Sequence, residues 1–168
     1  KTSKEVLVLS SVVQNAYFRN YWIKIAMRDM HYWQAVLNDY ATYDIADLLS
    51  AYNNSFEFLR NSSRSLQNST TYLAPDLQNL FYEKRMRVYE KSSSATDSLL
   101  SKVDNFQAMN LILYNMFTLV EFQKVENGST FFFNTTARTI LDSSMNDLLV
   151  VTSDLIEKVE TRLFGVLS

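Results

Sequence analysis

The scarcity of helix-breaking residues is the feature that most constrains how this chain folds. Only 2 Gly and 1 Pro occur among 168 residues, where average usage would give roughly 20. Strands need frequent turns, and turns need Gly, Pro or Asn at special backbone angles. We therefore expect no β-sandwich, β-barrel or Rossmann-type fold. Because 47% of the residues are apolar and 14% aromatic, disorder is excluded as well, and a protein of long helices remains.

Apolar residues recur at spacings of three and four along five segments, which is the pattern of amphipathic helices. We expect helices over residues 6–37, 45–66, 75–88, 99–127 and, starting between 130 and 135, up to 159. Pro75 suits the first turn of the third helix, and Gly128 suits a stop after the fourth. The sequence predicts an all-α fold, a long antiparallel bundle of four to five helices, arranged as one bundle or as two offset bundles.

Apolar periodicity is still present in the last residues, 163–168. We interpret residues 1–168 as a single helical-bundle domain, an excised ectodomain whose last helix continues toward a membrane. No run within the chain approaches 18 consecutive apolar residues, so any membrane contact is expected through flanking segments.

Charge and residue counts exclude several classes of function. The formal net charge is −2 and no basic stripe is present, which disfavours nucleic-acid binding. Absent cysteine removes disulfides, thiolate metal sites and cysteine nucleophiles. With His31 as the only histidine and no glycine-rich phosphate loop, we expect no enzyme, no metal and no cofactor.

Aromatic and basic residues surround the first predicted helix between residues 17 and 33, rather than following one stripe. Such a helix is either central in a bundle or lines a pocket. The candidate ligand-binding residues are Arg19, Trp22, Arg28, His31 and Trp33, because arginine pairs well with anionic ligands. In the alternative, the aromatic rings pack the core while Arg and Lys extend outward into solvent.

Five Asn-x-Ser/Thr motifs are candidate N-glycosylation sites, namely Asn53, Asn61, Asn68, Asn127 and Asn134. The first three are eight and seven residues apart, so on one helix they share the side opposite its apolar stripe. A glycan must lie outside the fold, and these positions are expected outside. A glycosylated secreted domain and a merely Ser/Asn-rich surface both remain open.

Phe131, Phe132 and Phe133 follow the expected stop at Gly128. Three consecutive aromatic residues cannot all face one core stripe of a helix. They either close the end of the bundle or form an apolar patch for an oligomeric contact.

Scattered fragments resemble the nitrate/nitrite-sensing (NIT) helical domain, among the all-helical extracellular sensor domains of membrane receptors. They are Val13-Gln14, Asp44 and Ala46, and Phe117 and Leu119 followed by Lys124 and Gly128. The resemblance implies a helical-bundle architecture and a receptor class. The family's Gln-x-Glu-Arg-Gly motif falls on residues 14–18, which lack its Glu and Arg, so the resemblance assigns no ligand-binding residue.

Two functional hypotheses follow. The first is an extracellular or cell-surface (periplasmic, if bacterial) ligand-sensing domain of a transmembrane signalling receptor, which passes a helix displacement to the membrane. Its partners would be a small-molecule ligand or a protein, in a homo-oligomer. The alternative is a structural or self-assembling extracellular glycoprotein subunit that works through protein-protein contacts.

Overall fold

The computed structural model describes residues 2–37, 45–89, 100–125, 128–133 and 135–168. Within them helices dominate, so the all-α prediction is confirmed. The elements are α1 (Thr2–Leu37), α2 (Ile45–Thr70), α3 (Pro75–Tyr82), β1 (Met86–Tyr89), β2 (Leu100–Val103), α4 (Asn105–Thr118), β3 (Val120–Val125), β4 (Gly128–Phe133) and α5 (Thr135–Leu167).

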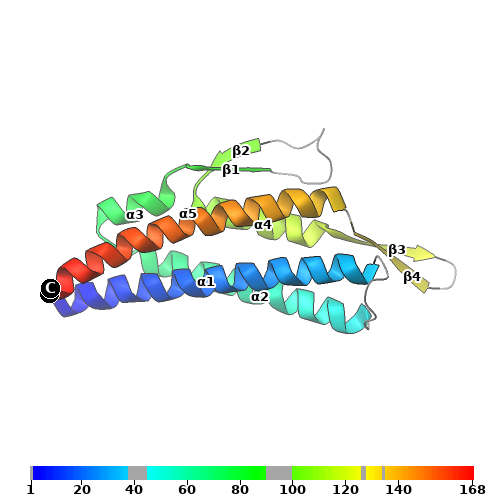
Figure 1. The fold of residues 1–168 in the computed structure, drawn as a ribbon, viewed down its shortest axis with the longest axis horizontal. Coiled ribbons are helices and arrows are strands. Elements are labelled where there is room, and N and C mark those ends of the chain that lie inside the picture. Colours follow the sequence, from blue (N-terminus) through cyan, green and yellow to red (C-terminus); the bar gives the residue numbers. More distant parts are fainter. Residues whose placement is uncertain (1, 38–44, 90–99, 126–127, 134) are drawn as a thin grey trace.

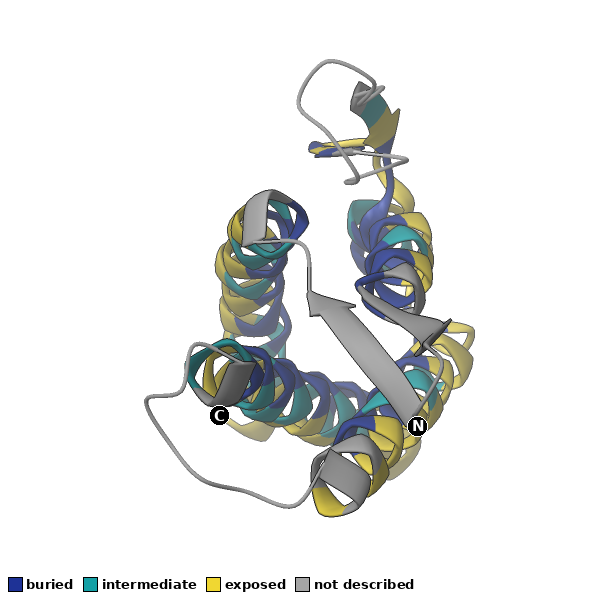
Figure 2. Cartoon of the chain, turned by 90° about the vertical axis from the view of Figure 1, so that its right-hand side faces the viewer, coloured by how far each residue is buried: buried dark blue, intermediate teal, exposed yellow. Residues whose placement is uncertain are grey.

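The long helices form a bundle in which α1 packs along both α2 and α5, and α4 packs against α2 and α5 on the other side (Figure 1). The fourth position of the bundle is shared by α3 and α4, which both pack against α5. A view along the bundle shows the buried faces of the helices turned toward a common interior (Figure 2). This arrangement is the packing expected for amphipathic helices that each bury one face.

The helices α1 and α5 run antiparallel beside each other for most of their length (Figure 1). As a result, α1 begins and α5 ends at the same end of the bundle. We call this the proximal end, and the opposite end, where β3 and β4 extend outward, the distal end.

The interior consists of two clusters of buried apolar side chains. The distal cluster includes Ile23, Trp33, Leu59, Ile112 and Leu148. The proximal cluster includes Leu9, Val12, Leu66, Phe81, Phe106 and Leu155. Each long helix contributes to both clusters, so the same helices are held together on both sides of the middle of the bundle.

Two antiparallel β-hairpins correct the helix boundaries predicted from the sequence. The third helix ends at Tyr82, and the following strand β1 pairs with β2 from Met86↔Val103 to Tyr89↔Leu100. Met86 and Val88 are buried while Arg87 between them is exposed, which is the two-residue alternation of a strand. Val88 is thus a core residue, as its place in the predicted helical stripe indicated, but it lies on a strand, and Met86 is buried beside it.

The second hairpin replaces the predicted end of the fourth helix. α4 ends at Thr118, and β3 pairs with β4 from Val120↔Phe133 to Val125↔Gly128. Gly128 therefore begins a strand instead of terminating a helix, which corrects the prediction. Val120 and Phe122 alternate with Glu121 and Gln123, and this alternation favours a strand over a helix.

Helix α4 begins in the middle of the bundle, where the chain returns from the β1–β2 hairpin. Asp104 is its N-cap: its Oδ1 accepts hydrogen bonds from the backbone N–H of Phe106 and of Gln107, both at 2.9 Å. The Gln107 Oε1 in turn accepts from the Asp104 N–H at 3.2 Å. This capping box satisfies the free amides of a helix start that solvent does not reach freely.

Candidate functional site

Arg19 is fully buried at the centre of the bundle. Its Nη2 donates hydrogen bonds to Asn105 Oδ1 at 2.5 Å and to Thr152 Oγ1 at 2.9 Å, and its Nη1 donates to Ser63 Oγ at 3.4 Å. The guanidinium carbon also lies 5.8 Å from the centre of the Phe106 ring. One arginine of α1 thus joins α2, α4 and α5 through its own donors.

These four polar residues form a layer between the two apolar clusters, which we call the Arg19 layer. Along α1, Arg19 lies between Ala16 of the proximal cluster and Ile23 of the distal cluster. Ser63 and Thr152 occupy the corresponding places on α2 and α5, and Asn105 is the first residue of α4. Asn105 Nδ2 also donates to Thr152 Oγ1 at 3.1 Å.

The Arg19 layer holds a positive charge without a neutralising carboxylate among the described residues. Burial lowers the pKa of Arg19 to about 9, because a low-dielectric interior disfavours the charged form. Its Nε is buried and has no hydrogen-bond partner among those residues. At neutral pH the guanidinium remains charged, so the layer is a costly element of the core.

The candidate residues Arg19, Trp22 and Arg28 point in different directions. Trp22 is half-buried on the outer seam of α1 and α2, where its ring stacks on Phe58 at 4.5 Å between centroids. Arg28 is exposed and donates to Asp29 Oδ1 at 3.3 Å. The structure therefore does not bring these three into one pocket.

The candidates His31 and Trp33 also lie apart. Half-exposed His31 contacts α5, with its Nε2 2.9 Å from Asp142 Oδ2, and Arg138 forms an ion pair with the same carboxylate. Burial raises the pKa of Asp142, although the charges of His31 and Arg138 act in the opposite direction. Trp33 is buried in the distal cluster, with its ring edge-on to Tyr52 at 5.8 Å.

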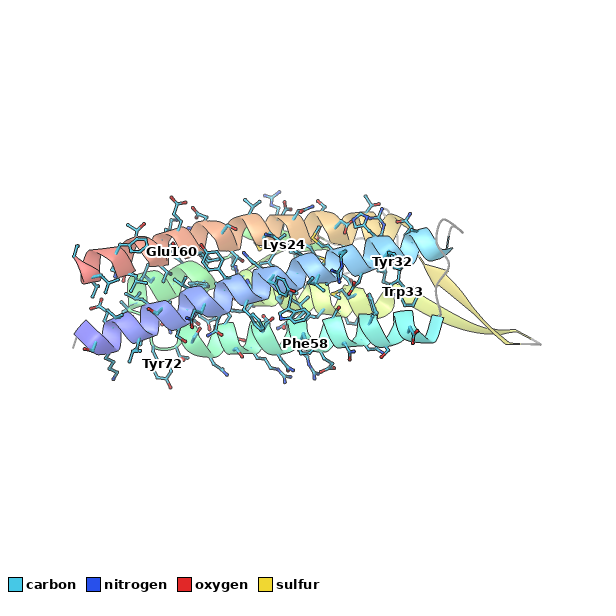
Figure 3. All side chains as sticks on the ribbon, turned by 60° about the horizontal axis from the view of Figure 1, so that its bottom comes forward. Lys24, Tyr32, Trp33, Phe58, Tyr72 and Glu160 are labelled. Carbon is cyan, nitrogen blue, oxygen red and sulfur yellow. The ribbon has the colours of Figure 1, made fainter. Side chains whose placement is uncertain are left out.

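In the middle of α1, one basic side chain is buried and three aromatic side chains are exposed, the reverse of a simple core helix. Arg19 is buried, while Tyr17, Phe18 and Tyr21 are each more than half exposed. Phe18, Tyr21, Trp22 and Phe58 form a continuous aromatic patch, in which Phe18 and Tyr21 meet the Trp22 ring edge-on at 6.1 and 5.3 Å. Figure 3 shows Phe58 at the seam between α1 and α2.

A groove of about 370 Å³ lies at the proximal end, where sequence reasoning had placed no site. It is lined by Lys4, Glu5, Val8, Leu9, Tyr72, Leu73, Ala74, Leu77 and Arg162. We call it the proximal groove. The signal for it is weak in the sequence, because its residues come from α1, the α2–α3 turn, α3 and α5.

A second groove of about 530 Å³ lies between α3 and α5 and shares Leu77 and Arg162 with the first. Arg162 Nη2 donates to Asp76 Oδ2 at 2.5 Å. This ion pair joins α5 to the start of α3 at the boundary of the two grooves.

Three of the five candidate glycosylation sites lie in described helix. Asn53, Asn61 and Asn68 are all exposed on α2, as the spacing predicts, so a glycan on each would extend into solvent. Asn127 and Asn134 lie outside the described residues. Whether any of the five carries a glycan stays a prediction.

Phe131, Phe132 and Phe133 belong to strand β4 at the distal end. Their backbone pairs with residues 120–122 of β3. The oligomeric contact proposed for them stays a prediction.

Metal and membrane sites are not evident in the part of the chain that the structure describes. There, no three His, Asp or Glu residues gather as a metal site would require. Over the same residues, every helix is too short or too polar to cross a bilayer. The candidate site is thus a set of non-covalent features: the Arg19 layer, the aromatic patch and the proximal groove.

Comparison with known proteins adds no assignment. No protein-family model matches the sequence, and no curated protein or solved structure matches it significantly.

Proposed function

We propose that this protein is a ligand-sensing helical-bundle domain of a transmembrane signalling receptor, on the extracellular side of the membrane. Its ligand-dependent step is a small displacement of α5 against α1. The observation that carries the proposal is that these two long helices run side by side and finish together at the proximal end. Segments that continue from both would leave the bundle in the same direction, as two membrane helices require.

The Arg19 layer supports displacement as the mechanism. The apolar clusters on either side of the Arg19 layer are close-packed and resist sliding, so they limit any displacement to a small one. The layer instead joins α5 to α1 through Arg19–Thr152 at 2.9 Å, while the same arginine also reaches Ser63 and Asn105. A guanidinium with several acceptors around it can exchange partners over a shift of 1–2 Å, which is the usual size of helix shifts in allosteric proteins.

Displacement is tested with spin labels, for which a chain without cysteine offers a clean background. We expect a ligand to change the distance between labels at Leu7→Cys on α1 and Phe164→Cys on α5, both exposed positions. A label pair at Lys24→Cys and Glu57→Cys, exposed on α1 and α2, is the control and should not change.

The ligand panel consists of amino acids, small carboxylates and inorganic anions, screened first by thermal shift. The proposal predicts a compound that raises the melting temperature and moves only the α1–α5 pair by about 1–2 Å. If compounds that bind leave both pairs unchanged, the sensing function is wrong.

Glycosylation and extracellular location belong to the same proposal. The exposure of Asn53, Asn61 and Asn68 supports both. Peptide mapping of the protein secreted from eukaryotic cells should find glycan on at least one of these three asparagines. Unmodified peptides at all three would remove this support for an extracellular location.

A structural or self-assembling subunit is the second candidate, and the aromatic patch favours it. Exposed aromatic rings that contact one another are typical of the centre of protein interfaces. If assembly is the function, sedimentation velocity should show concentration-dependent oligomers that the Phe18→Ser/Phe58→Ser double variant abolishes. Tyr114→Ser, at an equally exposed ring of α4, is the matched control. A monomer at all concentrations would contradict assembly through this patch.

A further inference from the structure

We propose that the proximal groove binds a free α-amino acid with an apolar side chain, and that this amino acid is the ligand of the sensing domain. The claim that this amino acid is the sensed ligand rests on the proposed function. The claim that the groove binds it is argued from the groove alone.

The floor of the groove is apolar and belongs to the proximal cluster. Leu9 of α1, Leu73 of the α2–α3 turn and Leu77 of α3 are buried core residues that also line the groove. A volume of about 370 Å³ is within the size range of small-molecule sites. The floor can therefore accept one apolar side chain against core residues that are already fixed.

Basic and acidic side chains line the same groove. Lys4 and Glu5 lie on α1, and Arg162 lies on α5. The hydrogen bond from Arg162 to Asp76, followed by the charges of Asp76 and Glu5, raises the pKa of Arg162. Glu5 and Arg162 line the same groove, one on α1 and the other on α5.

This arrangement fits a zwitterion better than a purely anionic or cationic molecule. Lys4 and Arg162 can pair with a carboxylate, and Glu5 can accept from an ammonium group. A ligand with only one charge would interact with either the basic or the acidic groups of the groove, but not with both. An α-amino acid carries both charges on one carbon and its apolar side chain on the same atom, so all three features of the groove are used at once.

The site also connects binding to the displacement. The ammonium partner Glu5 is on α1 and the carboxylate partner Arg162 is on α5. One ligand would thus hold the two helices that we propose to move. Competition between its carboxylate and Asp76 for Arg162 would loosen the link from α5 to α3, which is an exposed ion pair of small intrinsic strength.

Isothermal titration calorimetry tests the site with L-leucine as the probe. Glycine lacks the side chain, 4-methylpentanoate lacks the ammonium group and 3-methylbutylamine lacks the carboxylate. We expect L-leucine to bind at least about tenfold more tightly than each of the three, since each lacks one interaction worth about a factor of ten. Equal affinity for L-leucine and glycine would overturn the proposal.

Two variants separate the charged contacts. Glu5→Gln should weaken the binding of L-leucine about tenfold, because the contact with its ammonium group is lost. The affinity for 4-methylpentanoate, which has no ammonium group, should change by less than about twofold. Arg162→Gln should weaken both. Glu57→Gln and Arg64→Gln, exposed on α2 and outside the groove, are matched controls with no expected effect. Unchanged L-leucine binding in folded Glu5→Gln protein, judged by circular dichroism, would show that the groove is not the site.

The spin-label experiment keeps the two proposals apart. If L-leucine binds in the groove but the α1–α5 distance stays fixed, the binding site stands and the sensing function fails. If another compound moves α5 while L-leucine does not bind, the sensing function stands and the amino-acid site is wrong.

Discussion

Arg19 holds its place because three helices present acceptors to one planar guanidinium. The Ser63, Asn105 and Thr152 side chains receive its hydrogen bonds, and Tyr52 shows the same rule elsewhere in the core, with its buried hydroxyl donating to the Met116 carbonyl oxygen. Burial raises the pKa of Tyr52. The Arg19 Nη atoms and the Tyr52 hydroxyl are thus buried polar groups whose hydrogen-bond partners lie on other helices.

Replacing Arg19 with Lys should destabilise the protein by about 2–4 kcal/mol. A lysine carries a single ammonium group that cannot reach all three acceptors, and buried acceptors left without donors cost about 1–3 kcal/mol each. Urea denaturation at pH 7 measures the change. Arg64→Lys on the exposed side of α2 should stay within about 0.5 kcal/mol, and an equal effect of both variants would contradict a specific role of Arg19.

The charge of Arg19 also predicts a pH dependence. The folded-state pKa of about 9 lies below that of the unfolded chain, so the unfolded state binds the proton more tightly. The cost of burying the charge is therefore complete below about pH 9 and decreases as the pH rises above it. The Arg19→Met variant shares all other titrating groups. The difference in free energy of unfolding between the wild type and this variant should be constant from pH 6 to 8. Between pH 9 and 11 it should shift in favour of the wild type. A difference that stays flat to pH 11 would show that Arg19 does not release its proton.

Arg19 was one of five candidate ligand-binding residues in the sequence, and its buried surroundings were not predicted. A run of aromatic and basic residues around the first predicted helix was interpreted as the sign of a central or pocket-lining helix. Instead, α1 packs along α2 and α5 and leaves Tyr17, Phe18 and Tyr21 more than half exposed. Whether Arg19 or Phe18 faces the interior depends on what the other helices offer, since an arginine is buried only against acceptors such as Asn105 and Thr152. These residues are 86 and 133 positions away in the chain, and periodicity carries no information on such pairs.

At the scale of elements, the helices were predictable and the hairpins were missed. Pro75 begins α3, as its fixed backbone angle predicts. The Asn127-Gly128 pair was interpreted as a helix stop, although the same pair between alternating apolar residues is also a strong hairpin signal. The β1–β2 hairpin was missed because each of its strands contains only four residues and because Val88 also fits a helical stripe.

The start of α4 is stabilised by its own capping box, which leads to a prediction for Asp104. Asp104→Ala should lower the free energy of unfolding by about 1 kcal/mol, since it removes the acceptor for two backbone amides. Asp147→Ala, at an exposed position within α5, is the control and should change stability by less than about 0.5 kcal/mol. Chemical denaturation with circular dichroism detection measures both. A smaller loss for Asp104 than for Asp147 would mean that the cap adds nothing.

At the scale of the whole molecule, the apolar interior consists of two clusters that follow one another along the long axis of the bundle. The helices form one bundle rather than two offset bundles. Its interior contains the two apolar clusters with the Arg19 layer between them. Between the clusters, the fully buried apolar packing is interrupted by this layer of hydrogen bonds, and partly buried Val151 packs against both clusters. Each cluster is thus expected to open partly on its own, as cooperative subunits of many proteins do.

Native-state hydrogen exchange tests this division with two equivalent substitutions on α2. Leu59→Ala in the distal cluster should lower amide protection mainly in the distal halves of the helices, and Leu66→Ala in the proximal cluster should do the reverse. Both leucines are fully buried, and such truncations cost about 2–5 kcal/mol. An equal loss of protection along all helices in both variants would show that the bundle opens as one unit.

The position of the two tryptophans gives this division an optical consequence. Trp33 belongs to the distal cluster and Trp22 packs against it, and the chain contains no other tryptophan. Indole emission therefore reports on one side of the Arg19 layer alone, whereas far-ultraviolet circular dichroism averages over every helix. A melting curve followed by tryptophan fluorescence therefore reports the unfolding of the distal cluster. Unfolding of the proximal half, with its groove, is detected as the difference between the circular dichroism and fluorescence curves.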